Sequence, residues 1–222
     1  MKKLALYIHF PFCKQKCYYC DFKSFANKEM YVDSYIEALC KEIEMYNYLK
    51  DEYEVTSIYL GGGTPSHIDS KHISKVLGFV RNNYIVNKDA EITIEINPGT
   101  VNKNKLQDYY KAGINRISFG VQSTDNQMLK NIGRIHTYEE FVKNFLEARS
   151  IGFNNISVDL IFGLPEQNIA NWKQTLDDII SLNSEHISAY SLKIEEGTTF
   201  GNLSSKGQLN LPTEEVEREM YY

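Results

Sequence analysis

The sequence lacks any run of about 18 apolar residues, so no segment is long enough to cross a membrane as a helix. A leader pattern is also missing, because only a short apolar stretch and no small-residue cleavage site follows Met1. Basic residues number 24 against 29 acidic ones, and the net charge of −5 argues against phosphate neutralisation on nucleic acid. We therefore expect a cytoplasmic protein with no nucleic-acid partner and no transmembrane segment, with peripheral membrane contact left open.

Cysteine is scarce too, and four residues in 222 are too few for the disulfide framework of a small secreted protein. Three of them, Cys13, Cys17 and Cys20, are spaced C-x3-C-x2-C directly after an apolar run. Closely spaced thiols in a reducing compartment are more often metal ligands than disulfides. Three thiolates around a four-iron cluster leave one iron free to bind a small molecule, so the spacing predicts a [4Fe-4S] cluster.

A structural zinc site is the alternative, with His9 or Asp21 as the fourth ligand. Zinc sites more often combine C-x2-C pairs that lie far apart in the sequence, and the aromatic residues around this triple suit a shielded cluster better. Cys40 lies within a helical pattern and is predicted to be a packed small hydrophobe.

Short β-like runs alternate with longer helical runs along the chain. The expected strands are 4–10, 55–60, 92–96, 114–119, 156–162 and 186–192. The expected helices are 29–49, 69–83, 102–112, 125–131, 138–150 and 168–182. About six β/α units predict one α/β domain with a parallel sheet, either an open doubly wound sheet or a partial barrel.

The pattern divides the chain into two parts. We assign residues 1–210 to the core domain. Thr213 is a good N-cap for a helix that begins shortly before the last residue, so residues 211–222 are expected to be the start of a truncated C-terminal region.

Polar and glycine-rich residues follow the C-terminal ends of the first five strands, where parallel sheets place their sites. Gly61-Gly62-Gly63-Thr64-Pro65 ends the second strand, and its glycines would let the backbone approach a ligand and expose N–H groups, or simply form a tight turn. Alternation in the third strand places Glu95 on the face opposite Ile92, Ile94 and Ile96. Such an acid suits a ribose hydroxyl or an ammonium group, or it is a solvated strand end.

The run Tyr7-Ile-His-Phe-Pro-Phe-Cys13, its two further cysteines and the segment 61–65 resemble the radical S-adenosylmethionine (SAM) superfamily. Within it, the chain is similar to the oxygen-independent coproporphyrinogen III oxidase group, and more closely to the haem chaperone branch, HemW. The resemblance covers essentially the whole chain. It implies a partial (β/α)6 TIM-like barrel of the radical SAM type, a [4Fe-4S] cluster, and SAM bound at the open iron.

The resemblance also implies roles for single residues. It places Gly62 and Glu95 at the first SAM, with Tyr7 near the cluster, and it puts Tyr19 in an aromatic position before the third cysteine. Positions that hold a second SAM in the oxidases match Gly63, Thr64, Gln122, Arg134 and Asp159. We expect no site role for His136, because a lone histidine in a loop is usually only a polar loop residue.

Two features favour the chaperone branch over the oxidases. The oxidases typically carry a further cysteine two residues after the third ligand, where this chain has Cys20-Asp21-Phe22, and they carry an extension ahead of the motif. The branch implies haem as the cargo of the full-length protein, haem or a porphyrinogen as ligand, and haem-acceptor proteins as partners. The alternatives are radical decarboxylation of coproporphyrinogen III to protoporphyrinogen IX, or a zinc-stabilised protein with no redox role. Whether the protein turns over a substrate stays open at this stage.

Overall fold

Six parallel strands form one curled sheet in this computed structural model, which describes residues 1–222. The strands follow the order β1-β4-β5-β6-β7-β8, so each strand lies beside its predecessor in the chain. This singly wound order resolves the choice left by the sequence, because a doubly wound sheet reverses its order at one point. The strands are β1 (Lys2–Phe10), β4 (Tyr53–Gly62), β5 (Ile85–Ile96), β6 (Arg116–Gln122), β7 (Ile156–Phe162) and β8 (His186–Ser191).

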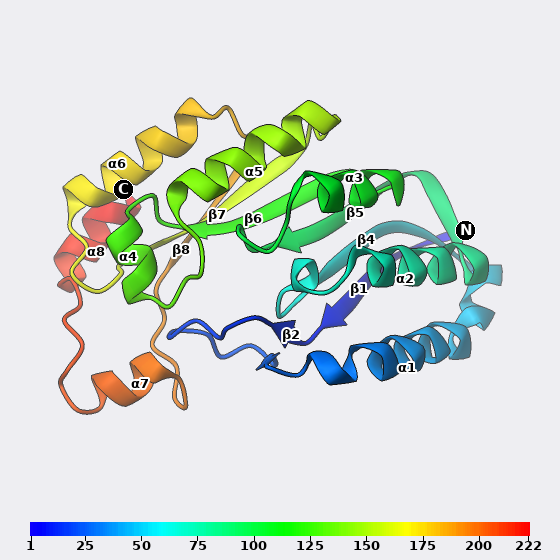
Figure 1. Cartoon of the computed structure of the whole chain (residues 1–222), viewed down its shortest axis with the longest axis horizontal. Helices are drawn as coiled ribbons and strands as arrows, with labels where there is room; N and C mark the ends of the chain where they lie inside the picture. Colours follow the sequence, from blue (N-terminus) through cyan, green and yellow to red (C-terminus); the bar gives the residue numbers. More distant parts are fainter.

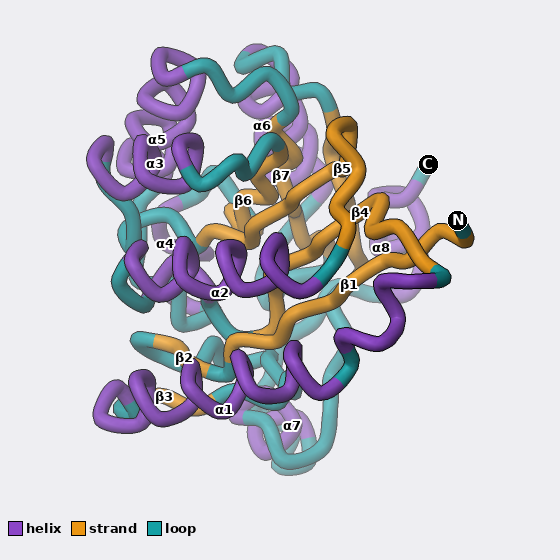
Figure 2. The backbone as a smooth tube through the Cα atoms, turned by 90° about the vertical axis from the view of Figure 1, so that its right-hand side faces the viewer, coloured by secondary structure: helices purple, strands orange, loops and turns teal.

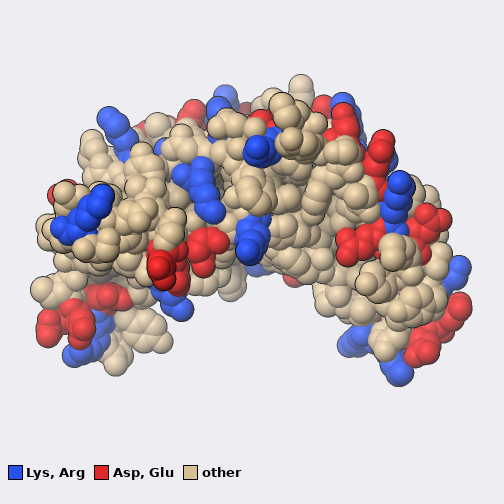
Figure 3. Space-filling model, turned by 90° about the horizontal axis from the view of Figure 1, so that it is seen from below, with Lys and Arg blue, Asp and Glu red and all other residues tan.

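Helices cover the outer face of the sheet (Figures 1 and 2). Neighbouring helices of this layer also pack on one another, in the order α1-α2-α3-α5. The sheet does not close, and the molecule is an arch that is hollowed along one side (Figure 3). The helices of the outer layer are α1 (Val32–Met45), α2 (Ser70–Asn83), α3 (Lys103–Lys111), α5 (Tyr138–Ile151) and α6 (Ile169–Ser181).

Strand alternation decides which side chains enter the core and which face the hollow. Along β5, Ile92, Ile94 and Ile96 are at most 5% exposed and belong to the main hydrophobic core, as expected from the sequence. Thr93 and Glu95 point to the opposite, concave face, where Glu95 borders a cavity. Cys40 is 4% exposed and packs in the same core, which confirms the prediction for this residue.

The cysteine segment leaves the sheet after β1 and is held by a small parallel pair, β2 (Phe12–Cys13) and β3 (Phe25–Ala26). Two short helices flank this segment, α4 (Asn126–Asn131) and α7 (Thr199–Ser204). The Phe200 N–H at the start of α7 donates to the Tyr18 carbonyl at 2.8 Å, and the Tyr18 N–H donates to the Ile132 carbonyl at 3.1 Å. The β2–β3 pair and the hydrogen bonds to α7 and to the end of α4 therefore hold the cysteine loop in place.

Three features differ from the sequence-based expectations. In place of the expected helix 29–49, the chain forms α1 between two 3-10 turns, η1 (Glu29–Tyr31) and η2 (Asn47–Asp51). The α-helix ends there because no core-facing apolar residue continues the helical spacing after Ile43. Strands β4 and β5 are longer than expected, and their register shifts between Val55 and Ser57. The helix α7 was not expected at all.

The last helix, α8 (Glu214–Tyr221), begins at the predicted N-cap, where the Thr213 hydroxyl accepts from the Val216 N–H at 3.4 Å. It packs against α6, and the Trp172 indole N–H donates to the Met220 carbonyl at 2.8 Å. No helix in the molecule combines the length and the apolar character that a bilayer span requires.

Candidate functional site

One cavity of about 760 Å³ lies along the concave face and the C-terminal strand ends. Its volume is within the usual range for small-molecule sites. Its wall includes all the site residues expected from the sequence except Tyr7, namely Cys13, Cys17, Tyr19, Cys20, Gly62, Gly63, Thr64, Glu95, Gln122, Arg134 and Asp159. Residues from five strands and three loops therefore meet at one place, although their roles as cofactor ligands stay predictions.

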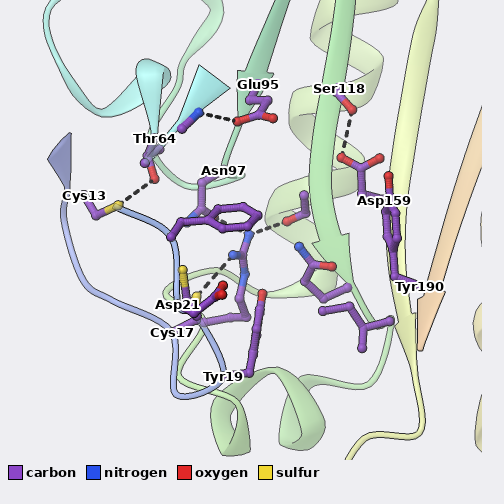
Figure 4. Close-up of a pocket in the computed structure, with 18 of the residues that line it drawn as sticks. Cys13, Cys17, Tyr19, Asp21, Thr64, Glu95, Asn97, Ser118, Asp159 and Tyr190 are labelled. Atoms are coloured by element: carbon purple, nitrogen blue, oxygen red, sulfur yellow. Dashed lines mark hydrogen bonds between the residues drawn. The ribbon is translucent and has the colours of Figure 1, made fainter. Parts of the chain in front are cut away.

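The three loop thiols all face this cavity but differ in their surroundings. Cys13 is 7% exposed and accepts from the Thr64 hydroxyl at 3.5 Å, while Cys17 accepts from the Arg134 guanidinium at 3.3 Å (Figure 4). Burial raises the pKa of the Cys20 thiol, and the neighbouring thiols Cys17 and Cys13 raise it further. Grouped thiols of this kind are the donor set of iron–sulfur clusters.

No group of three or more His, Cys, Asp or Glu side chains in the chain is arranged to hold a metal ion, and this includes the three loop thiols. The zinc alternative also requires a fourth ligand, and His9 is poorly placed for that role. Its Nε2 lies 2.8 Å from the Lys23 carbonyl and its Nδ1 lies 3.1 Å from the Tyr7 hydroxyl, so both ring nitrogens already have protein partners.

Arg134 lines the cavity and makes several hydrogen bonds there. Besides Cys17, its guanidinium donates to the Asn97 side-chain oxygen at 2.9 Å and to the Gly120 carbonyl, while its buried Nε has no partner. A Cβ on Gly120 would lie 3.1 Å from the Gln122 side-chain nitrogen, which is tighter than usual, and 3.4 Å from the same guanidinium, which is ordinary contact. The charge of this buried cation, beside the Cys17 thiol, suits a ligand that carries a carboxylate.

The glycine-rich end of β4 differs from one expectation. Its N–H groups do not point freely at a ligand: Gly62 donates to the Glu95 carboxyl at 3.1 Å, Gly63 to the Phe10 carbonyl at 2.8 Å, and Thr64 to the Phe12 carbonyl at 2.8 Å. The prediction of exposed N–H groups was therefore wrong, because the Glu95 carboxyl and the Phe10 and Phe12 carbonyls accept from them. Side chains are excluded all the same, since a Cβ on Gly63 would lie 2.8 Å from the Phe10 carbonyl oxygen.

Glu95 is held by two donors, the Gly62 N–H and the Tyr59 hydroxyl at 2.8 Å from Oε1 (Figure 4). Burial raises the pKa of this carboxyl, and the two hydrogen bonds oppose that rise. A carboxylate has about four acceptor positions, so two stay available to a hydroxyl or ammonium group in the cavity.

Asp159 and Gln122 border the same cavity from β7 and β6. Asp159 accepts from the Ser118 hydroxyl at 2.8 Å, and burial raises its pKa. Gln122 has a φ of 75°, in the left-handed region that non-glycine residues rarely occupy, at a point where the β6–β7 register shifts. The sequence could not show this irregular backbone, which places the amide in the cavity wall.

Two residues lie elsewhere than expected. Tyr7 does not line the cavity; it is 59% exposed, stacks on Tyr59 with ring centroids 6.1 Å apart and pairs with His9. The interpretation of His136 as a polar loop residue was wrong, because it is 4% exposed and neither ring nitrogen makes a hydrogen bond. Burial, aided by the Arg134 cation, lowers the pKa of His136 to about 3.

Sequence reasoning missed several residues of the wall, which share the concave face of their strands. Alternation and strand pairing would have found them, since each lies opposite a recognised residue, two positions from one, or two positions from a wall residue found in that way. They are Tyr59, Asn97, Arg116, Ser118, Ser188 and Tyr190.

Comparison with known proteins shows the family to which the chain belongs. The model of the radical SAM superfamily matches residues 7–179. The chain is 40% identical over 220 residues to the haem chaperone HemW of Bacillus subtilis (strain 168), which covers 98% of this chain and 58% of the relative. It is 42% identical over 200 residues to the haem chaperone HemW of Escherichia coli (strain K12), covering 90% and 53% of the two chains.

A solved structure is also similar. Coproporphyrinogen III oxidase (HemN) from Escherichia coli, described as a radical SAM enzyme, matches with a TM-score of 0.90 at 29% identity, over 99% of this chain and 51% of that chain. The chain thus spans little more than half the length of these curated relatives.

Proposed function

Since the chain belongs to the radical SAM superfamily, we propose that it forms the radical SAM domain of a haem chaperone. One observation carries this proposal: three thiols, the glycine-rich end of β4, Glu95 and Arg134 line a single cavity. The proposed cluster ligands are Cys13, Cys17 and Cys20. When bound, a [4Fe-4S] cluster of this superfamily supplies an electron for the reductive cleavage of the SAM sulfonium.

The residues present fit this pair of cofactors. The thiols are the donors that iron–sulfur clusters require. Arg134 places a buried positive charge in the cavity wall, which suits a carboxylate, and Glu95 offers free acceptor positions toward an ammonium or ribose group. We propose that Gly62 and Glu95 bind the first SAM, and that Gly63, Thr64, Gln122, Arg134 and Asp159 contact a second one.

The chaperone role is proposed over the oxidase role on two grounds. The relatives with 40% and 42% identity are both named haem chaperones, whereas the solved oxidase structure is 29% identical. The second residue after the third cysteine, Cys20, is Phe22, where the oxidases typically have a cysteine. On this proposal the full-length protein binds haem and passes it to acceptor proteins.

Anaerobic reconstitution of the full-length protein tests the proposal. We expect about four irons and four sulfides per chain, SAM binding, and haem binding without decarboxylation of coproporphyrinogen III. Formation of protoporphyrinogen IX would favour the oxidase alternative. Stoichiometric zinc with no iron would refute both readings.

A further inference from the structure

Arg116 is a second arginine in the cavity wall, and the cofactor sites proposed above leave it without a role. It begins β6 and lies opposite Thr93 of β5, to whose hydroxyl its Nη1 donates at 3.3 Å. No carboxylate lies within ion-pair distance of it. A guanidinium has five N–H donors. No buried nitrogen of Arg116 lacks a hydrogen-bond partner, so its free donors are accessible from the cavity.

No acid near Arg116 is paired with it. Asp159 borders the same cavity, but its carboxyl accepts from the Ser118 hydroxyl rather than from the arginine. Glu95 accepts from the Tyr59 hydroxyl and the Gly62 N–H, and Glu91 accepts from the Thr93 hydroxyl. Arg134 differs from Arg116, because its donors are largely committed to Cys17, Asn97 and Gly120.

Aromatic side chains stand on both sides of this cation. Tyr59 reaches the cavity from β4, and Tyr190 from β8, where it is 58% exposed. In Figure 4, Tyr190 and Asp159 lie on the side of the pocket opposite Cys13. Exposed Lys193 lies just beyond β8, also borders the cavity and has no ion-pair partner. The far half of the cavity therefore combines aromatic faces with cations.

We infer that this half binds a flat aromatic ligand with free carboxylates, and that Arg116 is the residue that anchors a carboxylate. An arginine fork matches a carboxylate in two parallel hydrogen bonds, which gives orientation as well as affinity. The inference rests on the proposed function, because haem is such a ligand: a planar ring that carries two carboxylate side chains. The inference adds to the proposed function the part of the cavity that binds these carboxylate side chains.

The test compares haemin with haemin dimethyl ester, which keeps the ring but lacks free carboxylates. Both are titrated into the full-length protein, as wild type, Arg116→Gln, Arg116→Lys and the control Lys173→Gln, which removes an exposed cation on α6. Binding is followed by the haem absorbance, and the thermal unfolding midpoint of each variant reports its folding.

Wild type should bind haemin more tightly than the ester. Arg116→Gln should weaken haemin binding about ten- to hundredfold, the usual range for a charge-assisted hydrogen bond, and should change ester binding less than about twofold. Arg116→Lys should fall between the two proteins, and Lys173→Gln should match wild type. If Arg116→Gln does not fold, the lysine variant decides by the same ester comparison.

Two results overturn the inference alone: haemin binding that no Arg116 substitution changes, or equal weakening of haemin and ester. Absence of haemin binding by the wild-type protein would overturn the proposed chaperone function and this inference together.

Discussion

His136 makes a quantitative prediction about stability and pH. The residue is 4% exposed, neither ring nitrogen is hydrogen-bonded, and its pKa is lowered to about 3 by burial and by the nearby Arg134. In the unfolded chain the same imidazole has a pKa of about 6.5. Between these two pH values the imidazole is protonated in the unfolded state and neutral in the folded state. The free energy of unfolding therefore falls as the pH falls below about 6.5.

The magnitude follows from the two pKa values. Each pH unit below the unfolded pKa costs about 1.4 kcal/mol, and the loss begins gradually near that pKa. From pH 7 to pH 5, His136 alone should therefore remove about 2 kcal/mol from the free energy of unfolding, a large share of the stability of a typical domain. The loss stops near the folded pKa, below which both states are protonated.

Urea unfolding at a series of pH values measures this effect. Trp172 is the only tryptophan, is 3% exposed and donates to the Met220 carbonyl, so its fluorescence reports on unfolding. His136→Leu removes the titrating group, and the difference between the wild-type and variant curves cancels the carboxylates that both proteins share. The difference should change by about 2 kcal/mol from pH 7 to pH 5. Parallel curves would show that His136 is not held neutral.

Three further predictions concern the site and its support. Cys40→Ala should keep the iron content of reconstituted protein, and iron analysis should show it lost on alanine substitution of any loop thiol, that is Cys13, Cys17 or Cys20. Tyr59→Phe removes a donor to Glu95 and should weaken SAM binding about tenfold by calorimetry, whereas Tyr84→Phe, whose hydroxyl bonds outside the cavity, should not; equal affinities would count against the Glu95 site. Lys105→Met leaves the carbonyls of Ser66 and Thr100 without their ammonium donor and should lower the urea-unfolding stability by about 2 kcal/mol.

The sequence predicted most of the fold because the relevant signals are local. Apolar periodicity located all six strands of the sheet and five outer helices, and the order of β/α units required a parallel sheet. The helix α7 was missed because its sequence, Thr-Phe-Gly-Asn-Leu-Ser, has weak helical propensity and one buried residue, Phe200. Its contact with the cysteine loop is a tertiary one, which no local pattern contains.

By itself, the sequence determined which chemistry the chain carries: three thiols at a fixed spacing, a glycine-rich strand end, and acidic, amide and guanidinium groups at later strand ends. The tertiary structure alone decided how these groups are used. Tertiary contacts placed Arg134 against Cys17 and gave Glu95 two donors, while the Glu95 carboxyl and the Phe10 and Phe12 carbonyls accept from the N–H groups of the glycine segment. Such contacts also buried His136 and left Arg116 open, because burial and hydrogen-bond partners depend on contacts between segments far apart in the chain.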